Sequence, residues 1–331
     1  MASTYTQTKT VDAIYTRFAE NYVGNPEYRD NFYKDRPLLY ALREKARVMT
    51  SGGQNLKHRI NFGTTANGGS LARNQTFTIQ GDMNETASTW TWSVLFETCF
   101  VSWWDTMETQ NSPYAVQSVV ESRLKEMDEN LQVTILSQLT QTSKAASADL
   151  NTLIEIVATT GATGGLDPAT TGQETWAAQM EETINWSAEA VGRSRELKTA
   201  VEKRKGKPDI IVLPSAYRDE SCEIGDAMQV SNVDAKTKGG TLYANLGTQV
   251  VTILGLPIVS DDVWDTNQAA QGLMLDLSAI HLVENSQWSM WTAPFKDMTH
   301  FGRLGQATVK LYVAQLTCSS RRAQGRYKTI S

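Results

Sequence analysis

The chain has 331 residues, of which 40% are hydrophobic and 20% are charged, and its formal net charge is -5 at pH 7. This length is enough for one large domain or two modest ones, and no run approaches the roughly 18 apolar residues of a membrane span. The acidic balance argues against a free, high-affinity nucleic-acid binder, but it does not exclude a shell that encloses a polyanion.

The start of the sequence has no basic region followed by an apolar one, so we expect no secretory signal. Cys99, Cys222 and Cys318 are far apart and lack a C-x-x-C spacing, which favours reduced, buried thiols. Three matches to the glycosylation sequon are interpreted as chance, because no secretory signal is expected. A cytosolic site of assembly is therefore expected.

The first 90 residues are predicted to hold little core of their own. Residues 1–30 are polar and aromatic without periodicity, which is typical of an arm that needs a partner surface. Residues 31–54 are predicted to hold a short helix that opens at Arg36-Pro37 and is closed by Ser51-Gly52-Gly53. Residues 55–90 contain two short alternating segments separated by glycines, which predict an extended hairpin-like loop.

A strand and a long helix follow. Apolar side chains alternate from Trp90 to Phe100, a period of two that predicts a strand ending near Trp103-Trp104. Ser112 is a good N-cap and Pro113 a good first helical residue. Apolar residues then recur at steps of three and four: Val116, Val119, Val120, Leu124, Met127, Leu131, Ile135 and Leu139. We predict a helix over about 112–142, which is about 45 Å long at about 1.5 Å per residue.

The turn-rich segment from Thr159 to Gly165 suggests a boundary between a domain over 91–160 and another over 161–318. A helix is expected at about 174–202, followed by mainly β structure and a C-terminal tail at 319–331. Without regular βαβ alternation, the predicted class is α+β.

No chemistry-bearing constellation is apparent. His58, His281 and His300 lack metal-ligand spacing, and no serine lies in a Gly-x-Ser-x-Gly elbow. The glycines around Gly161 lack the lysine of a phosphate loop. Asp261-Asp262 fits a solvated loop better than a cation site. We therefore expect no catalytic residue, no cofactor and no metal.

Aromatic and basic residues are the candidate contact residues. Trp90, Trp92, Trp103 and Trp104 are expected in the core or at a subunit interface, because aromatic anchors dominate protein contacts. The basic end around Arg321-Arg322 is expected to be solvated or to form salt bridges with a neighbour, with DNA contact as the alternative.

The order of these segments resembles the major capsid proteins of tailed bacteriophages with the Hong Kong 97-type fold. No single phrase is specific, but their joint order is. In chain order the phrases are Ser51-Gly52-Gly53, Ile60-Asn61-Phe62-Gly63, Thr89-Trp90-Thr91-Trp92, Asn111-Ser112, Gly164-Gly165-Leu166-Asp167 with Trp176 downstream, Lys207-Pro208-Asp209-Ile210-Ile211-Val212, Gly255-Leu256-Pro257-Ile258-Val259-Ser260-Asp261 and Ser319-Ser320-Arg321-Arg322.

The resemblance implies an N-terminal arm, an extended loop over the adjacent subunit, a peripheral domain with a long spine helix, and a mixed α/β axial domain. It implies self-assembly as pentamers and hexamers into an icosahedral head around double-stranded DNA, with expansion on maturation. The implied partners are further copies of the chain, a separate scaffolding protein, a portal protein and a possible decoration protein, but no membrane.

Residue roles follow from the same resemblance. Trp90, Trp92, Trp103, Trp104, Arg73 and Lys57 are candidate assembly residues, and Gly52, Gly53, Gly161, Gly164 and Gly165 are candidate hinges. Lys57 is the lone lysine of the loop and has no matching partner, so no covalent cross-link is predicted. Two alternatives remain, an encapsulin-like nanocompartment shell and a soluble α+β hydrolase.

Overall fold

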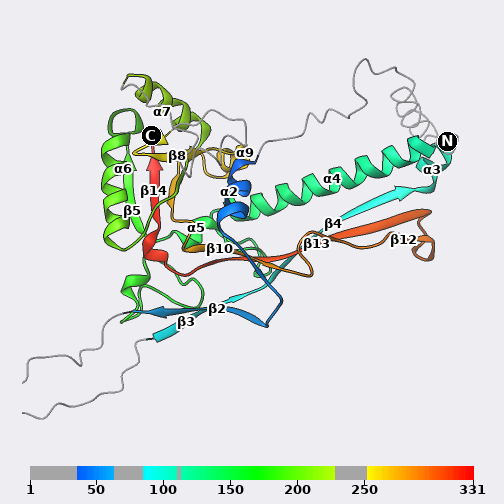
Figure 1. Cartoon of the computed structure of the whole chain (residues 1–331), viewed down its shortest axis with the longest axis horizontal. Helices are drawn as coiled ribbons and strands as arrows, with labels where there is room; N and C mark the ends of the chain where they lie inside the picture. Colours follow the sequence, from blue (N-terminus) through cyan, green and yellow to red (C-terminus); the bar gives the residue numbers. More distant parts are fainter. Residues whose placement is uncertain (1–35, 63–84, 110–112, 228–251) are drawn as a thin grey trace, which may run out of the picture. The chain divides into compact units, whose positions relative to one another are not determined.

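The computed structural model describes residues 36–62, 85–109, 113–227 and 252–331 (Figure 1). These residues belong to one compact unit, residues 34–331. The predicted arm at 1–30, Arg73 and Ser112 lie outside the described residues. Helices and strands are mixed along the described chain, which confirms the predicted α+β class, while the division into two domains near residue 161 stays a prediction.

The first sheet is built around one long strand, β13 (Gly305–Cys318). It pairs antiparallel with β4 (Ser93–Ser102), from Gly305 opposite Ser102 to Ala314 opposite Ser93. The other strands are β10 (Ile280–Asn285), β11 (Trp291–Thr292) and β12 (Lys296–Asp297), which pair with β13, and β1 (Arg47–Thr50), which pairs with β10. The strand predicted after Trp90 is thus β4, with a break at Trp92 that separates it from β3.

The long helix expected at about 112–142 is α4 (Pro113–Thr140), which lies along β4 and β13 (Figure 1). Met127, Leu131, Ile135 and Leu139 of the predicted apolar stripe are buried. Met127 packs against Cys99 and Val101 of β4. Asp128 of α4 also forms an ion pair with Lys310 of β13, which connects the helix to the sheet. The stripe therefore faces the sheet, as its spacing of three and four requires.

The second sheet contains the C-terminal residues of the chain. Its order is β5 (Gln179–Ile184), β14 (Gly325–Ile330), β9 (Gly272–Leu275), β6 (Ile210–Val212), β8 (Leu256–Val259) and β7 (Thr252–Ile253). β14 is parallel to β5 and antiparallel to β9, and Tyr327 is fully buried. The expected C-terminal tail at 319–331 is therefore wrong, because Gly325–Ile330 forms a strand inside the sheet, between β5 and β9.

Two helix predictions need correction. The segment expected as a helix over 174–202 begins with η1 (Glu174–Trp176) and β5, and α6 (Trp186–Lys203) starts only after Asn185. Pairing with the distant β14 overrides the local helical spacing. The short helix α2 (Pro37–Lys45) ends before Ser51, because Arg47–Thr50 extends as β1 beside β10.

A buried carboxylate links α2 to the first sheet. Glu284 of β10 is fully buried and forms ion pairs with Arg43 of α2 at 3.3 Å and with Arg47 of β1 at 2.8 Å. It also accepts hydrogen bonds from Tyr312 Oη at 2.8 Å and Ser289 Oγ at 2.6 Å. Burial alone would raise the pKa of Glu284, but these donors and cations hold it below its ordinary value.

The hairpin predicted within 55–90 is formed by β2 (Asn55–Asn61) and β3 (Glu85–Thr91), paired antiparallel from Asn55 opposite Thr91 to Asn61 opposite Glu85. The remaining elements are α3 (Trp103–Thr109), α5 (Leu153–Ile156), α7 (Ser215–Ala227), α9 (Asp262–Asn267), η2 (Thr299–Phe301) and η3 (Arg321–Ala323). None of the described helices is both long and apolar enough to cross a membrane.

Candidate assembly surfaces

The two faces of β4 differ sharply in what covers them. Leu95, Cys99 and Val101 are buried on the side of α4. Val94 and Phe96 alternate with them and are 55% and 64% exposed. Because successive strand residues point to opposite faces, the exposed residues share the side of the sheet away from α4.

The neighbouring strands extend this apolar surface. Leu311 of β13 lies opposite Phe96 on one edge and opposite Trp291 of β11 on the other, so the three side chains share one face. The rings of Trp288 and Trp291 meet edge to face with centroids 4.9 Å apart. We call this surface the outer β4–β13 face. It comprises Val94, Phe96, Phe100, Trp288, Trp291, Leu311 and Val313.

More large apolar side chains are exposed at the end of β4. Trp103 and Trp104 begin α3 and are exposed, and Met107 follows on the same helix. Leu304 accepts a hydrogen bond from the backbone N–H of Trp103 at 3.3 Å and is also exposed. Trp103 and Trp104 are thus surface residues, and their predicted role in assembly stays a prediction. Large exposed apolar patches mark interaction sites on soluble proteins.

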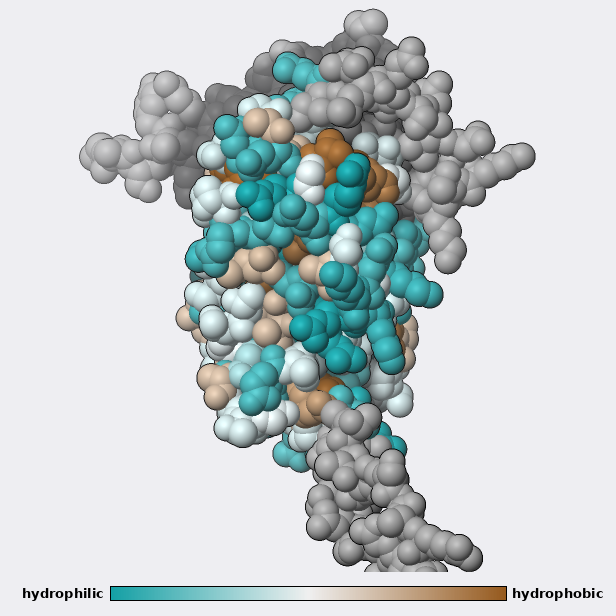
Figure 2. All heavy atoms as spheres, turned by 90° about the vertical axis from the view of Figure 1, so that its left-hand side faces the viewer, coloured by the Kyte–Doolittle hydropathy of each residue, from teal (hydrophilic) through white to brown (hydrophobic). Residues whose placement is uncertain are grey.

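The surface formed by α6 and β5 is more polar than the outer β4–β13 face. Viewed from the side of α6 and β5 (Figure 2), the surface is mainly hydrophilic, with small apolar patches toward the top and the bottom. On α6, Arg193 forms ion pairs with Glu189 at 3.3 Å and with Glu196 at 3.2 Å. Such a surface is stable in water without a partner.

The base of the β2–β3 hairpin is the second candidate surface. His58 of β2 stacks on His281 of β10 with ring centroids 5.2 Å apart, and its Nε2 lies 2.9 Å from Thr317 Oγ1 of β13. Gln315 of β13 donates from Nε2 to the carbonyl of Thr91 at 2.7 Å. These contacts hold the hairpin against the first sheet.

Gly164 makes a further contact that fixes the hairpin, through β3. Its carbonyl accepts a hydrogen bond from the N–H of Thr89 at 2.8 Å. Its φ is +63°, and a Cβ built there would lie 2.6 Å from Cζ2 of the buried Trp90. Glycine is therefore required at this position both by conformation and by space. Trp90 belongs to the core of one chain, one of the two environments predicted for it.

The other glycines named as hinges have positive φ and open surroundings. Gly52, Gly161 and Gly165 have φ of +135°, +85° and +77°, and a Cβ at each would meet nothing within 4 Å. Gly53 has φ of +117°, and its carbonyl accepts a hydrogen bond from Trp92 Nε1 at 2.7 Å. The hinge role of these glycines stays a prediction.

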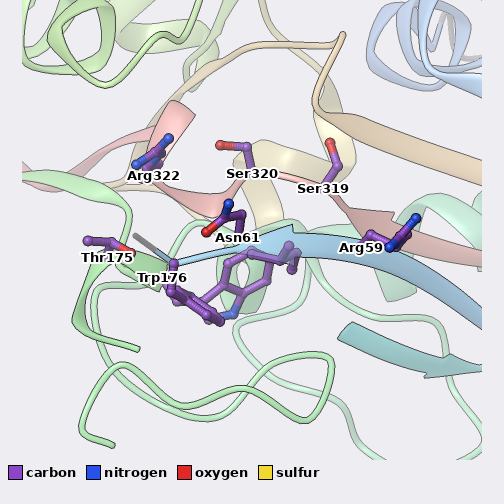
Figure 3. Close-up of a pocket in the computed structure, with 9 residues that line it drawn as sticks. Arg59, Asn61, Thr175, Trp176, Ser319, Ser320 and Arg322 are labelled. Carbon is purple, nitrogen blue, oxygen red and sulfur yellow. The ribbon is translucent and has the colours of Figure 1, made fainter. Parts of the chain in front are cut away.

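A hollow of about 190 Å³ lies beside the hairpin base. Figure 3 shows Arg59 and Arg322 toward its two ends, Asn61 and Ser320 between them, and Trp176 beneath. Guanidinium, amide and hydroxyl groups suit an anionic group such as a carboxylate or a phosphate. Lys57 is exposed on the same outer face of β2 as Arg59.

The sequence analysis missed one buried cation. Arg321 is only 1% exposed, although the basic end was expected to be solvated or to pair across an edge. Its guanidinium donates to the carbonyls of Ile156 at 3.0 Å, Gly161 at 2.9 Å and Glu155 at 2.9 Å. Burial lowers the pKa of Arg321 to about 10. The adjacent Arg322 follows the prediction better, since it is only partly buried, so sequence alone gave no signal that separates the two.

Asp261 also differs from expectation. It is buried rather than in a solvated loop, and it caps α9 by accepting the N–H of Val263 at 3.0 Å. Burial raises the pKa of Asp261 to about 6. Among the residues that the structure describes, no group of three histidine, cysteine or acidic side chains could hold a metal ion. Cys99 and Cys318 are buried as predicted, whereas Cys222 is only partly buried.

Comparison with known proteins identifies the fold. A scan against models of protein families and a search of curated proteins give no match. Solved structures give many. The chain resembles a subunit of the cyanophage A-1(L) capsid with a TM-score of 0.67 at 13% identity, covering 95% of this chain and 98% of that one.

Two further structures show the range of the likeness. The encapsulin SrpI of Synechococcus elongatus PCC 7942 matches with a TM-score of 0.58 at 10% identity over 96% and 95% of the two chains. The mature capsid of bacteriophage PhiM1 matches with a TM-score of 0.54 at 11% identity over 94% and 91%. The chain therefore has the Hong Kong 97-type fold, and its relatives in structure are shell subunits of phage capsids and of an encapsulin.

Proposed function

We propose that this chain is the major capsid protein of a tailed bacteriophage. Copies of it assemble as pentamers and hexamers into an icosahedral head that encloses double-stranded DNA and expands on maturation. The observation that carries the proposal is likeness to capsid subunits along almost the whole chain, with 95% of this chain matched to the cyanophage subunit. The chain acts as a structural protein of the virion.

The outer β4–β13 face supports the same conclusion on physical grounds. Phe96 is 64% exposed in the isolated chain, and Leu311 and Trp291 lie beside it on the same face. A soluble monomer gains nothing from such a surface, whereas a shell subunit buries it against a neighbour. We propose that this face is covered in the assembled shell.

The partners follow from the proposed assembly. Copies of the chain are the first, and contacts that are not self-complementary close into rings before they tile a shell. We further propose a separate scaffolding protein, a portal protein and a possible decoration protein, with packaged DNA inside and assembly in the host cytoplasm. We assign no catalytic activity, and the hydrolase alternative finds no support among shell proteins.

An encapsulin-like nanocompartment is the second candidate, because an encapsulin shares the fold with a TM-score of 0.58. Phage heads and encapsulin compartments use similar subunits to enclose different contents. The difference between the two candidates therefore lies in the contents and size of the shell.

The experiment is negative-stain microscopy with size-exclusion chromatography, on the protein expressed alone and with a candidate scaffolding protein. Rings of five or six subunits, or closed shells, are expected. Shells that contain nuclease-sensitive DNA support the capsid, and small shells filled with a co-purified enzyme support the nanocompartment. A monodisperse monomer under both conditions contradicts both candidates.

A matched pair of variants tests the surface itself. We expect Phe96→Glu to abolish shell formation, because it places a carboxylate in a buried apolar contact at a cost of about several kcal/mol per subunit. Thr199→Glu introduces the same side chain at an exposed position of α6, outside the outer β4–β13 face, and is expected to assemble normally. Circular dichroism checks that both variants fold. A folded Phe96→Glu chain that still forms shells would rule out this surface.

A further inference from the structure

Two histidines are stacked at the base of the β2–β3 hairpin. His58 and His281 are two of the three histidines in the chain, and they come from strands more than 200 residues apart in sequence. Their rings stack with centroids 5.2 Å apart and an angle of 28° between planes. Both side chains are partly buried where the hairpin meets the first sheet.

A threonine hydroxyl links the two histidines and limits how the ring of His58 is protonated. Thr317 Oγ1 donates to the carbonyl of His281 at 3.2 Å, so its single proton is already used. While Thr317 donates to that carbonyl, Nε2 of His58, 2.9 Å away, donates to Thr317 Oγ1, and it must do so once both ring nitrogens carry protons. A second proton on His58 would then bind at Nδ1. Acid leaves this hydrogen bond in place and adds positive charge to the contact.

The groups around the pair are poorly suited to neutralise that charge. Ser88 of β3 lies opposite His58, and Thr317 of β13 lies opposite His281, and both are neutral. Lys57 and Arg59 flank His58 in the sequence, but both lie on the outer face of β2, away from the histidine ring. Glu284 of β10 differs in parity from His281, so its carboxylate lies on the other face of the sheet with Tyr312, where it is paired with Arg43 and Arg47.

We propose that His58 and His281 form an acid-labile contact, so that protonation of both rings separates the base of the β2–β3 hairpin from the sheet of β10 and β13. Neutral rings stack and stabilise the docked hairpin. Two imidazolium rings at the same distance repel each other. The proposal concerns the individual chain and does not depend on the proposed shell.

The direction of the pH dependence follows from the burial of both rings. Burial lowers the pKa of His281, and burial together with the charge of His281 lowers the pKa of His58, from the ordinary 6.5. The docked state thus binds protons less readily than the released state. Its stability is fully present above the ordinary pKa and is lost as the pH falls through the lowered values.

Hydrogen–deuterium exchange of the full chain at about pH 7.5 and about pH 5 measures this release, because the two values bracket the ordinary range of histidine titration. Exchange is corrected for its intrinsic pH dependence, and β6 (Ile210–Val212) in the second sheet is the internal reference. We expect the amides of β2 to exchange at least about tenfold faster, relative to β6, at the lower pH. A tenfold change in exchange corresponds to about 1.4 kcal/mol. Two unit charges 5.2 Å apart repel each other by more than this, even at an effective dielectric constant of about 20.

Three variants make the test specific. His58→Gln and His281→Gln each remove one of the two charges, and either should abolish most of the acid response. His300→Gln changes an exposed histidine of η2 and should respond like the wild type. If His58→Gln does not fold, His281→Gln gives the same test, because it keeps the bond between His58 and Thr317. A wild type without an acid response, or a response that persists in either folded variant, overturns the proposal.

Discussion

The strands β2 and β4 share one pattern of alternating burial, but the outer surface of β2 is polar and that of β4 is apolar. Each alternates between a side that packs within the chain and a side that faces outward. The outer residues of β2 are Asn55, Lys57, Arg59 and Asn61, whereas those of β4 include Val94, Phe96 and Phe100. The first surface is polar and can stay exposed to water at little cost, whereas the second gains free energy when another surface covers it.

This difference separates two kinds of information in one period-two pattern. The buried side of each strand specifies how the chain folds, because it must match a support that the chain itself supplies. The outer side does not have to match any surface within the chain. An outer side that is nevertheless apolar points to a contact outside the chain, which is how β4 differs from β2.

The largest effect is expected from breaking the support of the hairpin. Gly164→Ala places a Cβ 2.6 Å from the Trp90 ring at a φ of +63°. Left-handed strain of about 1–2 kcal/mol and overpacking of about 1–3 kcal/mol combine to a loss of about 4 kcal/mol in the free energy of unfolding. Urea denaturation measures it.

Gly165→Ala is the matched control for this change. Its φ is +77°, but a Cβ there meets nothing within 4 Å. Only the strain of about 1–2 kcal/mol is expected. If the two variants lose equal stability, the contact between Gly164 and Trp90 does not support the hairpin.

The next largest effect on stability is expected on the buried face of β4, and the exposed face of the same strand provides the comparison. Leu95 is 5% exposed and packs in the main core, whereas its neighbour Phe96 is largely exposed. We expect Leu95→Ala to reduce the stability of the unassembled chain by about 3 kcal/mol, because it leaves a cavity. Phe96→Ala should change it by about 0.5 kcal/mol or less and weaken assembly instead. A large loss in unassembled Phe96→Ala would show that the outer face belongs to the fold.

The parts of this fold that sequence alone predicted are those with a long, unambiguous period. β4 alternates over ten residues, and α4 keeps its apolar stripe over 28 residues. Neither pattern fits the other kind of element. The resemblance to capsid proteins then ordered these elements into the fold that the structural comparisons confirm.

The errors occurred where two structures satisfy the same local pattern. Trp176, Met180 and Ile184 are four residues apart, which fits a helix, yet Gln179–Ile184 is a strand because β14 offers a partner about 150 residues later in the chain. Arg321 and Arg322 are identical in type and adjacent, and only the carbonyls around residues 155–161 decide which is buried. Such partners are properties of the fold and are invisible in local sequence.

The smallest effect is expected on the outer face of β2. Lys57 is exposed and lies opposite Thr89, so Lys57→Ala should change the free energy of unfolding by about 0.5 kcal/mol or less. The variant should also form shells as the wild type does, since the exposed Lys57 side chain can stay in water at little cost. Denaturing gel electrophoresis of wild-type shells should show only the single chain, because no cross-link through Lys57 is predicted. Covalent multimers that vanish in Lys57→Ala would mean that this polar face, like the apolar face of β4, serves the contact between subunits.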